Sequence, residues 1–311
     1  MNGTVYFRTR KFGPYGKLSH KNLDDLRSGN RSLLVSGEDE KEDPLDFVLW
    51  KPKKEGEPAW SSPWSDGRPG WHIECSVMSK KYIGEQIDIH AGGEDLVFPH
   101  HENEIAQSEA CNGKEFAKYW MHNAFLNIDN KKMSKSLGNF FTVREISEKY
   151  DLQVLRFFML NAHYRSPLNF SAELMQSSKA GLDRIVTAAD NLKHLAASAK
   201  DGGMTESELA HYDASEEFVK KFEEAMDDDF NTADAISSIF ELVKYLNTHT
   251  GADNSKEYLQ KCLERLKTLC DILGLVIEKK EELLDADVEA LLAERQQARK
   301  EKNFARAYEF R

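Results

Sequence analysis

The sequence is poor in cysteine and contains no long apolar run. Its 311 residues include only four cysteines, at Cys75, Cys111, Cys262 and Cys270. Four are too few for a disulfide framework in a chain of this length. No apolar run approaches the about 20 residues that a membrane helix needs, and the first ten residues lack the features of a signal peptide. We therefore expect a cytoplasmic protein with no membrane partner.

Proline and tryptophan are missing from the chain beyond residue 167. No tryptophan lies beyond Trp120, and no proline follows Pro167. Leucine and cysteine in 259–273 recur at three- and four-residue spacings, which is typical of an amphipathic helix. Segments 174–195 and 236–246 have similar periodicity, and Asn231 and Thr232 are candidate N-caps for the latter. The back half is predicted to be a helical bundle with connections near 201–203 and 251–254.

Basic residues are outnumbered, with 42 Lys and Arg against 53 Asp and Glu, a net charge of −11. This balance argues against a protein that coats nucleic acid over its whole surface, but it permits a local basic face. The last seventeen residues carry six Lys or Arg and two Glu. Either a solvated helix face or a face that contacts phosphates fits this segment.

The front half alternates short apolar runs with helical stretches, which predicts an α/β fold. We expect strands at 46–50, 87–90 and 124–128. Residues 51–70 are rich in Pro, Gly, Trp and Ser and are predicted to form a long ordered loop. Thr142 and Glu145 have the spacing of a capping box, so a helix should begin there and 130–141 should be a loop.

Histidines crowd into a short part of the front half. His72, His90, His100 and His101 lie within 30 residues of one another, together with Cys75. On a helix, His100 and Glu104 would project from one face, and Cys75 could add a thiolate from elsewhere. Zinc accepts sulfur, nitrogen and oxygen ligands. By spacing alone this is a weak signal, and core histidines with a buried free cysteine are the simpler explanation. A protease-type H-E-x-x-H motif is excluded, because Ile105 stands where the second histidine is required.

The most informative string of the sequence is K-M-S-K-S at residues 132–136, followed by Leu137 and Gly138. It places two lysines, two hydroxyls and a glycine in a short loop just before a helix. Ammonium groups and a close backbone suit the binding of polyphosphate. A solvated basic loop is the simpler explanation for most pairs of lysines at this spacing.

These residues resemble a known family. K-M-S-K-S is similar to the nucleotide-binding loop of class I aminoacyl-tRNA synthetases. GRPGWHIECS at 67–76 and FPHHENEIAQS at 98–108 resemble cysteinyl-tRNA synthetases in particular, and AMDDDFNT at 225–232 extends the resemblance into the back half. The resemblance covers nearly the whole chain.

The resemblance implies three regions. Residues 1–141 would be the second part of a Rossmann-like catalytic domain with a zinc site, 142–205 a helical region that contacts the tRNA stem, and 206–311 a truncated helical domain that binds the anticodon arm. The implied reaction joins cysteine to ATP, used with Mg²⁺, and then transfers the cysteinyl group to tRNA(Cys). Zinc (Zn²⁺) would bind the substrate thiolate and so reject serine.

The resemblance also implies roles for single residues. The zinc ligands would be Cys75, His100 and Glu104, and Trp71, His90 and Asp95 would bind or flank the substrates. Catalysis would depend on Lys132 and Lys135. The ATP-binding loop would consist of Lys132, Met133, Ser134, Lys135 and Ser136.

The sequence departs from the family in two respects. It contains neither a HIGH-type histidine motif nor the cysteine that provides the fourth zinc ligand in the family. We therefore expect an internal fragment of a longer monomeric enzyme or a specialised paralogue, inactive by itself. A related ligase that joins cysteine to an amino sugar, and a non-catalytic zinc- or RNA-binding module, are the alternative functions.

Overall fold

The structure, a computed structural model, describes residues 3–22, 41–133, 138, 140–278, 286–301, 303 and 306. The chain divides into two compact units. Unit 1 consists of Met1–Glu148 and Ala162–Leu174, and unit 2 consists of Lys149–Asn161 and Met175–Arg311. Within the described residues, no helix is long and apolar enough to cross a membrane.

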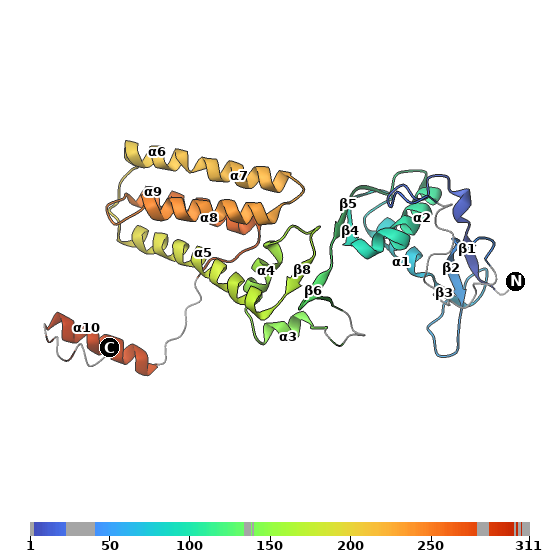
Figure 1. Cartoon of the computed structure of the whole chain (residues 1–311), viewed down its shortest axis with the longest axis horizontal. Coiled ribbons are helices and arrows are strands. Elements are labelled where there is room, and N and C mark those ends of the chain that lie inside the picture. Colours follow the sequence, from blue (N-terminus) through green and yellow to red (C-terminus); the bar gives the residue numbers. More distant parts are fainter. Residues whose placement is uncertain are drawn as a thin grey trace. The chain divides into compact units, whose positions relative to one another are not determined.

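The described residues of unit 1 form three small sheets (Figure 1). The antiparallel sheet has the order β1 (Val5–Phe7), β2 (Phe47–Pro52) and β3 (Gly67–Pro69). A parallel pair is formed by β4 (Ile87–Gly93) and β5 (Ala117–Asn123). In the third sheet, β6 (Leu126–Ile128) lies between β7 (Lys131–Lys132) and β8 (Leu168–Phe170). The expected strands at 46–50 and 87–90 are confirmed. The expected loop at 51–70 is confirmed for 53–66, which contain only an isolated bridge from Trp60 to Gly67, whereas its two ends belong to the paired strands β2 and β3.

Four short helices and two longer ones, α1 and α2, complete the described part of unit 1. They are η1 (Thr9–Lys11), α1 (Trp71–Tyr82), η3 (Glu94–Leu96), η4 (Val97–His101), α2 (Glu102–Asn112) and α3 (Val143–Ser147). As predicted, Thr142 caps α3: its hydroxyl accepts from Glu145 N, and the Glu145 carboxylate accepts from Thr142 N. A core of Ile87, Ile105, Phe116 and Ala117 holds α2 against the β4–β5 pair.

Gly70 fixes the place where α1 begins. Its N–H donates to Leu49 O in β2, at 2.8 Å. A Cβ atom at this position would lie 2.0 Å from Val48 O, so only glycine allows the chain to pass so close to β2. This contact places the first turn of α1 beside the antiparallel sheet. That turn carries Trp71 and His72.

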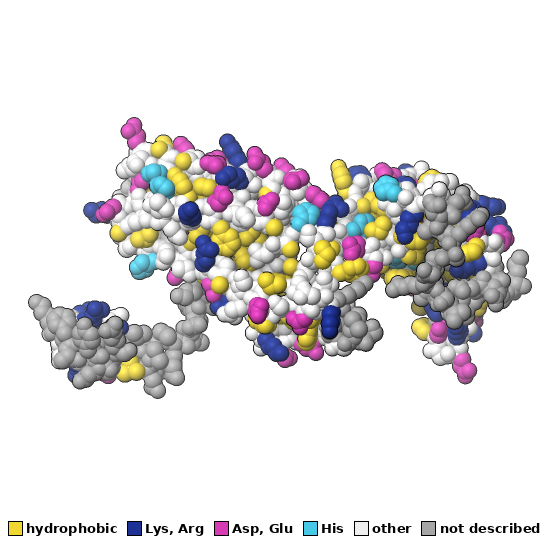
Figure 2. Space-filling model, in the orientation of Figure 1, with side chains coloured by type: hydrophobic (Ala, Val, Ile, Leu, Met, Phe, Trp, Pro, Cys, Tyr) yellow, Lys and Arg dark blue, Asp and Glu magenta, His cyan; other side chains and the backbone are white. Residues whose placement is uncertain are grey.

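Unit 2 is helical throughout its described part. Its helices are α4 (Leu152–Leu160), most of α5 (Ala172–Ser198), α6 (Glu206–Ala214), α7 (Glu216–Asp227), α8 (Thr232–His249), α9 (Lys256–Ile272) and α10 (Ala286–Lys300). The helices expected from the spacing of apolar residues are confirmed, and Asn231 caps α8 by accepting from Asp234 N. Figure 2 shows acidic and basic side chains interspersed over α6 and α7. Lys221, for example, pairs with both Glu217 and Glu241.

A buried carboxylate joins two helix starts in unit 2. Glu208 Oε2 accepts from the Thr205 N–H, which completes a capping box on α6. Both oxygens also accept from the residues that open α9: Ser255 N at 2.7 Å, Ser255 Oγ at 2.9 Å and Asn254 Nδ2 at 3.0 Å. Burial alone would raise the pKa of Glu208, but the hydrogen bonds from Thr205 and Ser255 outweigh it and lower the pKa to about 2.

We expect Glu208→Gln to destabilise the helical unit by about 2 to 3 kcal/mol at pH 7, because the amide removes the charge and adds two donors to a site filled with donors. The contribution of Glu208 should be complete above its ordinary pKa of 4.5 and should be lost as the pH falls through about 2. Denaturant unfolding followed by circular dichroism, at several pH values, measures both effects.

Glu206→Gln is the matched control, because Glu206 lies in the same first turn of α6 but is exposed. It should leave the stability nearly unchanged at every pH. A difference between wild type and Glu208→Gln that stays constant from pH 7 to pH 2 would contradict the assignment.

Candidate metal and substrate site

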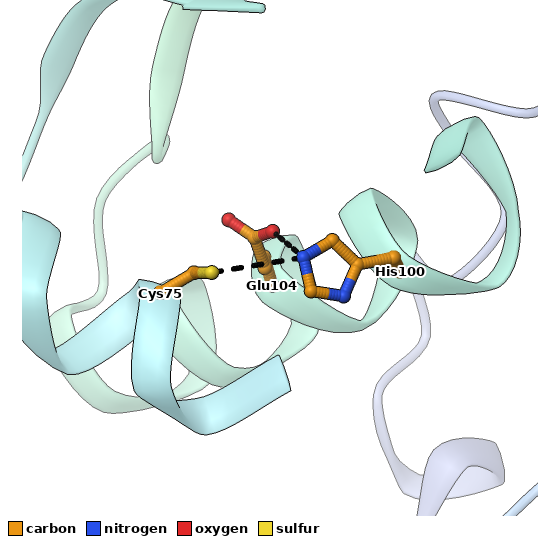
Figure 3. Close-up of side chains that lie close together, drawn as sticks. All are labelled: Cys75, His100 and Glu104. Atoms are coloured by element: carbon orange, nitrogen blue, oxygen red, sulfur yellow. Dashed lines mark hydrogen bonds and ion pairs between the residues drawn. The ribbon is translucent and has the colours of Figure 1, made fainter. Parts of the chain in front are cut away.

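Three side chains from separate turns of unit 1 meet at one point (Figure 3). Cys75 comes from α1, His100 from the end of η4, and Glu104 from the first turn of α2. His100 Nε2 lies 2.7 Å from Glu104 Oε1 and 3.7 Å from Cys75 Sγ. One ligand atom from each residue lies within 4.8 Å of the other two. The structure therefore brings together all three residues expected to bind zinc.

The i, i+4 spacing of His100 and Glu104 works as predicted, although the two residues lie in different segments. The turn η4 continues directly into α2, so His100 and Glu104 stay on one face of a continuous helical path. Cys75 reaches the same point because α1 packs against α2, where Ser76 Oγ donates to Gln107 Oε1 at 2.9 Å.

The Glu104 carboxylate is almost completely buried, with a side chain only 1% exposed. Its Oε1 lies 2.7 Å from His100 Nε2 and its Oε2 lies 2.9 Å from His90 Nε2, yet neither contact is directed as a hydrogen bond. Burial would raise the pKa of Glu104, but the two imidazoles beside it lower the pKa to about 2. A buried carboxylate whose neighbours are imidazoles and a thiol has the donor set of a zinc site.

A second group of histidines shares Glu104. His90, His101 and Glu104 each place a ligand atom within 4.8 Å of the others. His101 Nδ1 lies 2.8 Å from His122 Nε2, and the edge of the His90 ring meets Trp120 at 4.8 Å between centroids. Burial lowers the pKa of His101 to about 4, so this imidazole is neutral at pH 7. The structure thus places His90 beside Glu104 and Trp120. Its predicted role as a residue that flanks the substrates stays a prediction.

Trp71 lies at the edge of this site. Its ring centroid is 4.4 Å from that of His100, but the residue is 62% exposed. It is therefore not a core residue, and its indole forms an open wall next to the cluster. Asp95, in η3, is also exposed. The predicted roles of Trp71 and Asp95 toward a substrate stay predictions.

The K-M-S-K-S string begins on a strand. Lys132 belongs to β7 and is the register partner of Asn127 in β6, and Met133 N donates to Leu126 O at 3.2 Å. Ser134, Lys135 and Ser136 lie outside the described residues. The roles predicted for these residues, and for the Lys132 ammonium, are not tested by the structure.

His72, like His101 and His122, was not assigned a role from the sequence. His72 Nδ1 lies 2.7 Å from His100 Nδ1, the ring nitrogen that faces away from Glu104. Burial, and then the nearby His100, lower the pKa of His72 to about 4. The three-residue spacing between His72 and Cys75 on a helix was the available signal, because it places both on neighbouring faces of α1.

Comparison with known proteins gives two family matches. Residues 1–180 match the tRNA synthetases class I (C) catalytic domain, and residues 221–278 match the DALR domain. The whole chain is 72% identical to a cysteine–tRNA ligase of Lachnospira eligens and spans 67% of it. It is 54% identical to a cysteine–tRNA ligase of Clostridioides difficile and spans 66% of that protein. The chain thus has about two thirds of the length of these relatives.

Two solved structures share the fold. The LeuRS–tRNA–LeuAMS complex of Agrobacterium radiobacter K84 matches with a TM-score of 0.57 at 14% identity, over 73% of this chain and 32% of that one. Methionyl-tRNA synthetase of Mycobacterium tuberculosis, in complex with methionyl-adenylate, matches with a TM-score of 0.50 at 13% identity, over 73% of this chain and 50% of that one. Both support the α/β fold with a helical region.

The environment of Cys75 predicts its reactivity. Burial raises the pKa of this thiol, and the carboxylates of Glu104 and Glu74 raise it further. With a chelator present, iodoacetamide should alkylate Cys75 more slowly than the exposed Cys111. Glu104→Gln should speed the reaction at Cys75 by roughly threefold at pH 7.5, because a larger fraction becomes thiolate. Peptide mass spectrometry measures both rates.

Cys111 in the same molecules is the internal control, and its rate should not respond to Glu104→Gln. Circular dichroism of the variant reports whether the fold is intact. A Cys75 rate equal to that of Cys111, or one that Glu104→Gln leaves unchanged in a folded protein, would contradict the prediction.

Proposed function

The chain belongs to the cysteinyl-tRNA synthetase family of class I aminoacyl-tRNA synthetases, and we propose that it contributes the zinc site and the ATP-phosphate loop of a cysteine–tRNA ligase. The observation that supports this most strongly is the convergence of Cys75, His100 and Glu104 around one point. Its substrates would be cysteine, ATP and tRNA(Cys).

In this proposal, Cys75, His100 and Glu104 hold Zn²⁺ through sulfur, nitrogen and oxygen. When bound, the ion would take the substrate thiolate as a further ligand and so distinguish cysteine from serine, whose hydroxyl is a much poorer ligand. Trp71 stands beside His100 and would cover the amino acid. His90, held between Glu104 and Trp120, would face the substrates as a neighbour of the ligand set.

The K-M-S-K-S loop would bind ATP. Lys132 and Lys135 would neutralise the charge that develops on the phosphates in the transition state, with Mg²⁺ accompanying the nucleotide. Met133, Ser134 and Ser136 would bring backbone N–H groups and hydroxyls to the same phosphates. Asp95, just after the β4 strand, would lie on the substrate side.

The helical unit 2 favours a ligase that acts on tRNA among the possible functions. Its match to a DALR domain supports a ligase that acts on tRNA(Cys) over one that joins cysteine to an amino sugar. We further propose a monomeric cytoplasmic enzyme. A non-catalytic zinc- or RNA-binding role would be the outcome if the complete protein formed no cysteinyl-adenylate.

We expect the isolated chain to form no adenylate, because the sequence lacks the HIGH-type histidines that the family uses to bind ATP phosphates. Each such preorganised group contributes about 3 to 4 kcal/mol, so the loss of two slows the reaction more than about 10⁴-fold. Cysteine-dependent exchange of pyrophosphate into ATP measures this step. A full-length relative is the positive control, and robust exchange by this chain alone would refute the expectation.

The metal site can be tested without catalysis. The chain loaded with Co²⁺ should gain a sulfur-to-cobalt absorption band from Cys75, and added cysteine should strengthen the band while serine leaves it unchanged. With three protein ligands, metal should bind weakly and be removed by dialysis against a chelator. Cys75→Ser, His100→Ala and Glu104→Gln should each reduce binding, as judged by metal content.

Cys111→Ser is the matched control, because this exposed cysteine lies on the same helix as Glu104 and outside the ligand group. It should bind metal as the wild type does. If cysteine and serine changed the absorption band equally, the proposed selection of the thiolate would be excluded. If one metal ion per chain remained bound after dialysis against the chelator, the chain would have to provide more than three ligands.

A further inference from the structure

His72 contacts the outer side of the metal-binding imidazole. The two nitrogens of His100 face different partners: Nε2 lies 2.7 Å from Glu104 Oε1, and Nδ1 lies 2.7 Å from His72 Nδ1. The distance between the two Nδ1 atoms is that of a hydrogen bond. Each ring nitrogen of His100 therefore has one close neighbour.

The position of one proton follows from this geometry. At 2.7 Å, one of the two Nδ1 atoms must carry a hydrogen and the other must offer a lone pair. A metal ion bound at His100 Nε2 uses the lone pair of that nitrogen. The proton of a neutral His100 ring then resides on Nδ1, and His72 Nδ1 is left as the acceptor.

We propose that His72 is a positioning residue for the metal site: its Nδ1 accepts a hydrogen bond from the Nδ1–H of His100 and so fixes the tautomer and orientation in which His100 Nε2 meets the ion. Partners of this kind raise the basicity of a metal-binding imidazole and hold its ring in place. The inference rests on the zinc site proposed above and assigns a role to a residue outside the ligand set.

His72 is well placed to hold His100 still. Its ring meets Phe47 edge-on at 5.7 Å and stacks on Trp71 at 5.6 Å between centroids. His72 lies in the first turn of α1, just after the N-cap residue Gly70. The backbone of Gly70 lies against β2, and this contact fixes where the helix begins. Aromatic neighbours on both sides restrict rotation of the His72 ring, so its Nδ1 stays directed at His100.

The test compares two substitutions of His72 in the 311-residue chain. His72→Phe keeps an aromatic ring between Phe47 and Trp71 but offers no acceptor. His72→Asn places an amide oxygen near the former Nδ1 and restores the acceptor. Titration of Zn²⁺ against a colorimetric indicator should give a Kd about 10- to 100-fold weaker for His72→Phe. The Kd of His72→Asn should stay within about threefold of the wild type, because its acceptor is restored.

A nuclear magnetic resonance signal separates this role from general packing. In the zinc-loaded wild type, the Nδ1–H of His100 should give a slowly exchanging downfield resonance, identified by its loss in His100→Ala. The resonance should persist in His72→Asn and disappear in His72→Phe. Circular dichroism of the zinc-free proteins monitors folding.

The outcomes are distinguishable. Failure of the wild type to bind Zn²⁺ would refute the proposed metal site itself. Normal binding by the wild type together with equal affinity for His72→Phe, or with equal loss in both folded variants, would overturn the positioning role alone. Should His72→Phe fail to fold, the resonance in the wild type decides the question, because its absence would overturn the hydrogen bond.

Discussion

The burial of the Glu104 carboxylate is the constraint on which the arrangement of the candidate site in unit 1 depends. An ionised group removed from water must find partners, because its burial otherwise costs several kcal/mol. Glu104 places one oxygen beside His100 and the other beside His90, so two groups of histidines are arranged about a single side chain. The β4–β5 pair, η4 and α1 each contribute one neighbour, and the site therefore depends on how these elements pack.

Comparison of three buried glutamates explains why Glu104 stands out. Glu102 accepts from the N–H groups of Gly16 and Ser19, and Glu208 accepts from the residues that open α6 and α9. Both are structural carboxylates that collect donors and tie segments together. Glu104 has equal burial but no directed donor. Its neighbours are instead atoms that could share a metal ion with it, as in the proposed zinc site.

Much of the fold was predictable because it follows from local rules. The helices at α5, α8 and α9 follow from apolar spacing, and the start of α3 from a capping box. The expected strand at 124–128 begins later, at Leu126, because Ala124 N donates to Tyr164 O outside the sheet. The loop expected at 51–70 holds for 53–66, but the pairing of its two ends in β2 and β3 was missed, because three paired residues are too few to show strand alternation.

The sequence alone determined the family, through the K-M-S-K-S string and two motifs rich in histidine, and it determined that His100 and Glu104 share a face, because a helical turn is a local property. Only the tertiary structure decided that Cys75 meets them, since α1 must pack on α2 to bring its thiol within 3.7 Å of His100. The same is true of the contact between His72 and His100, and of the burial of Glu104 between His100 and His90. These features depend on distances between segments far apart in the chain, which spacing along a sequence does not encode.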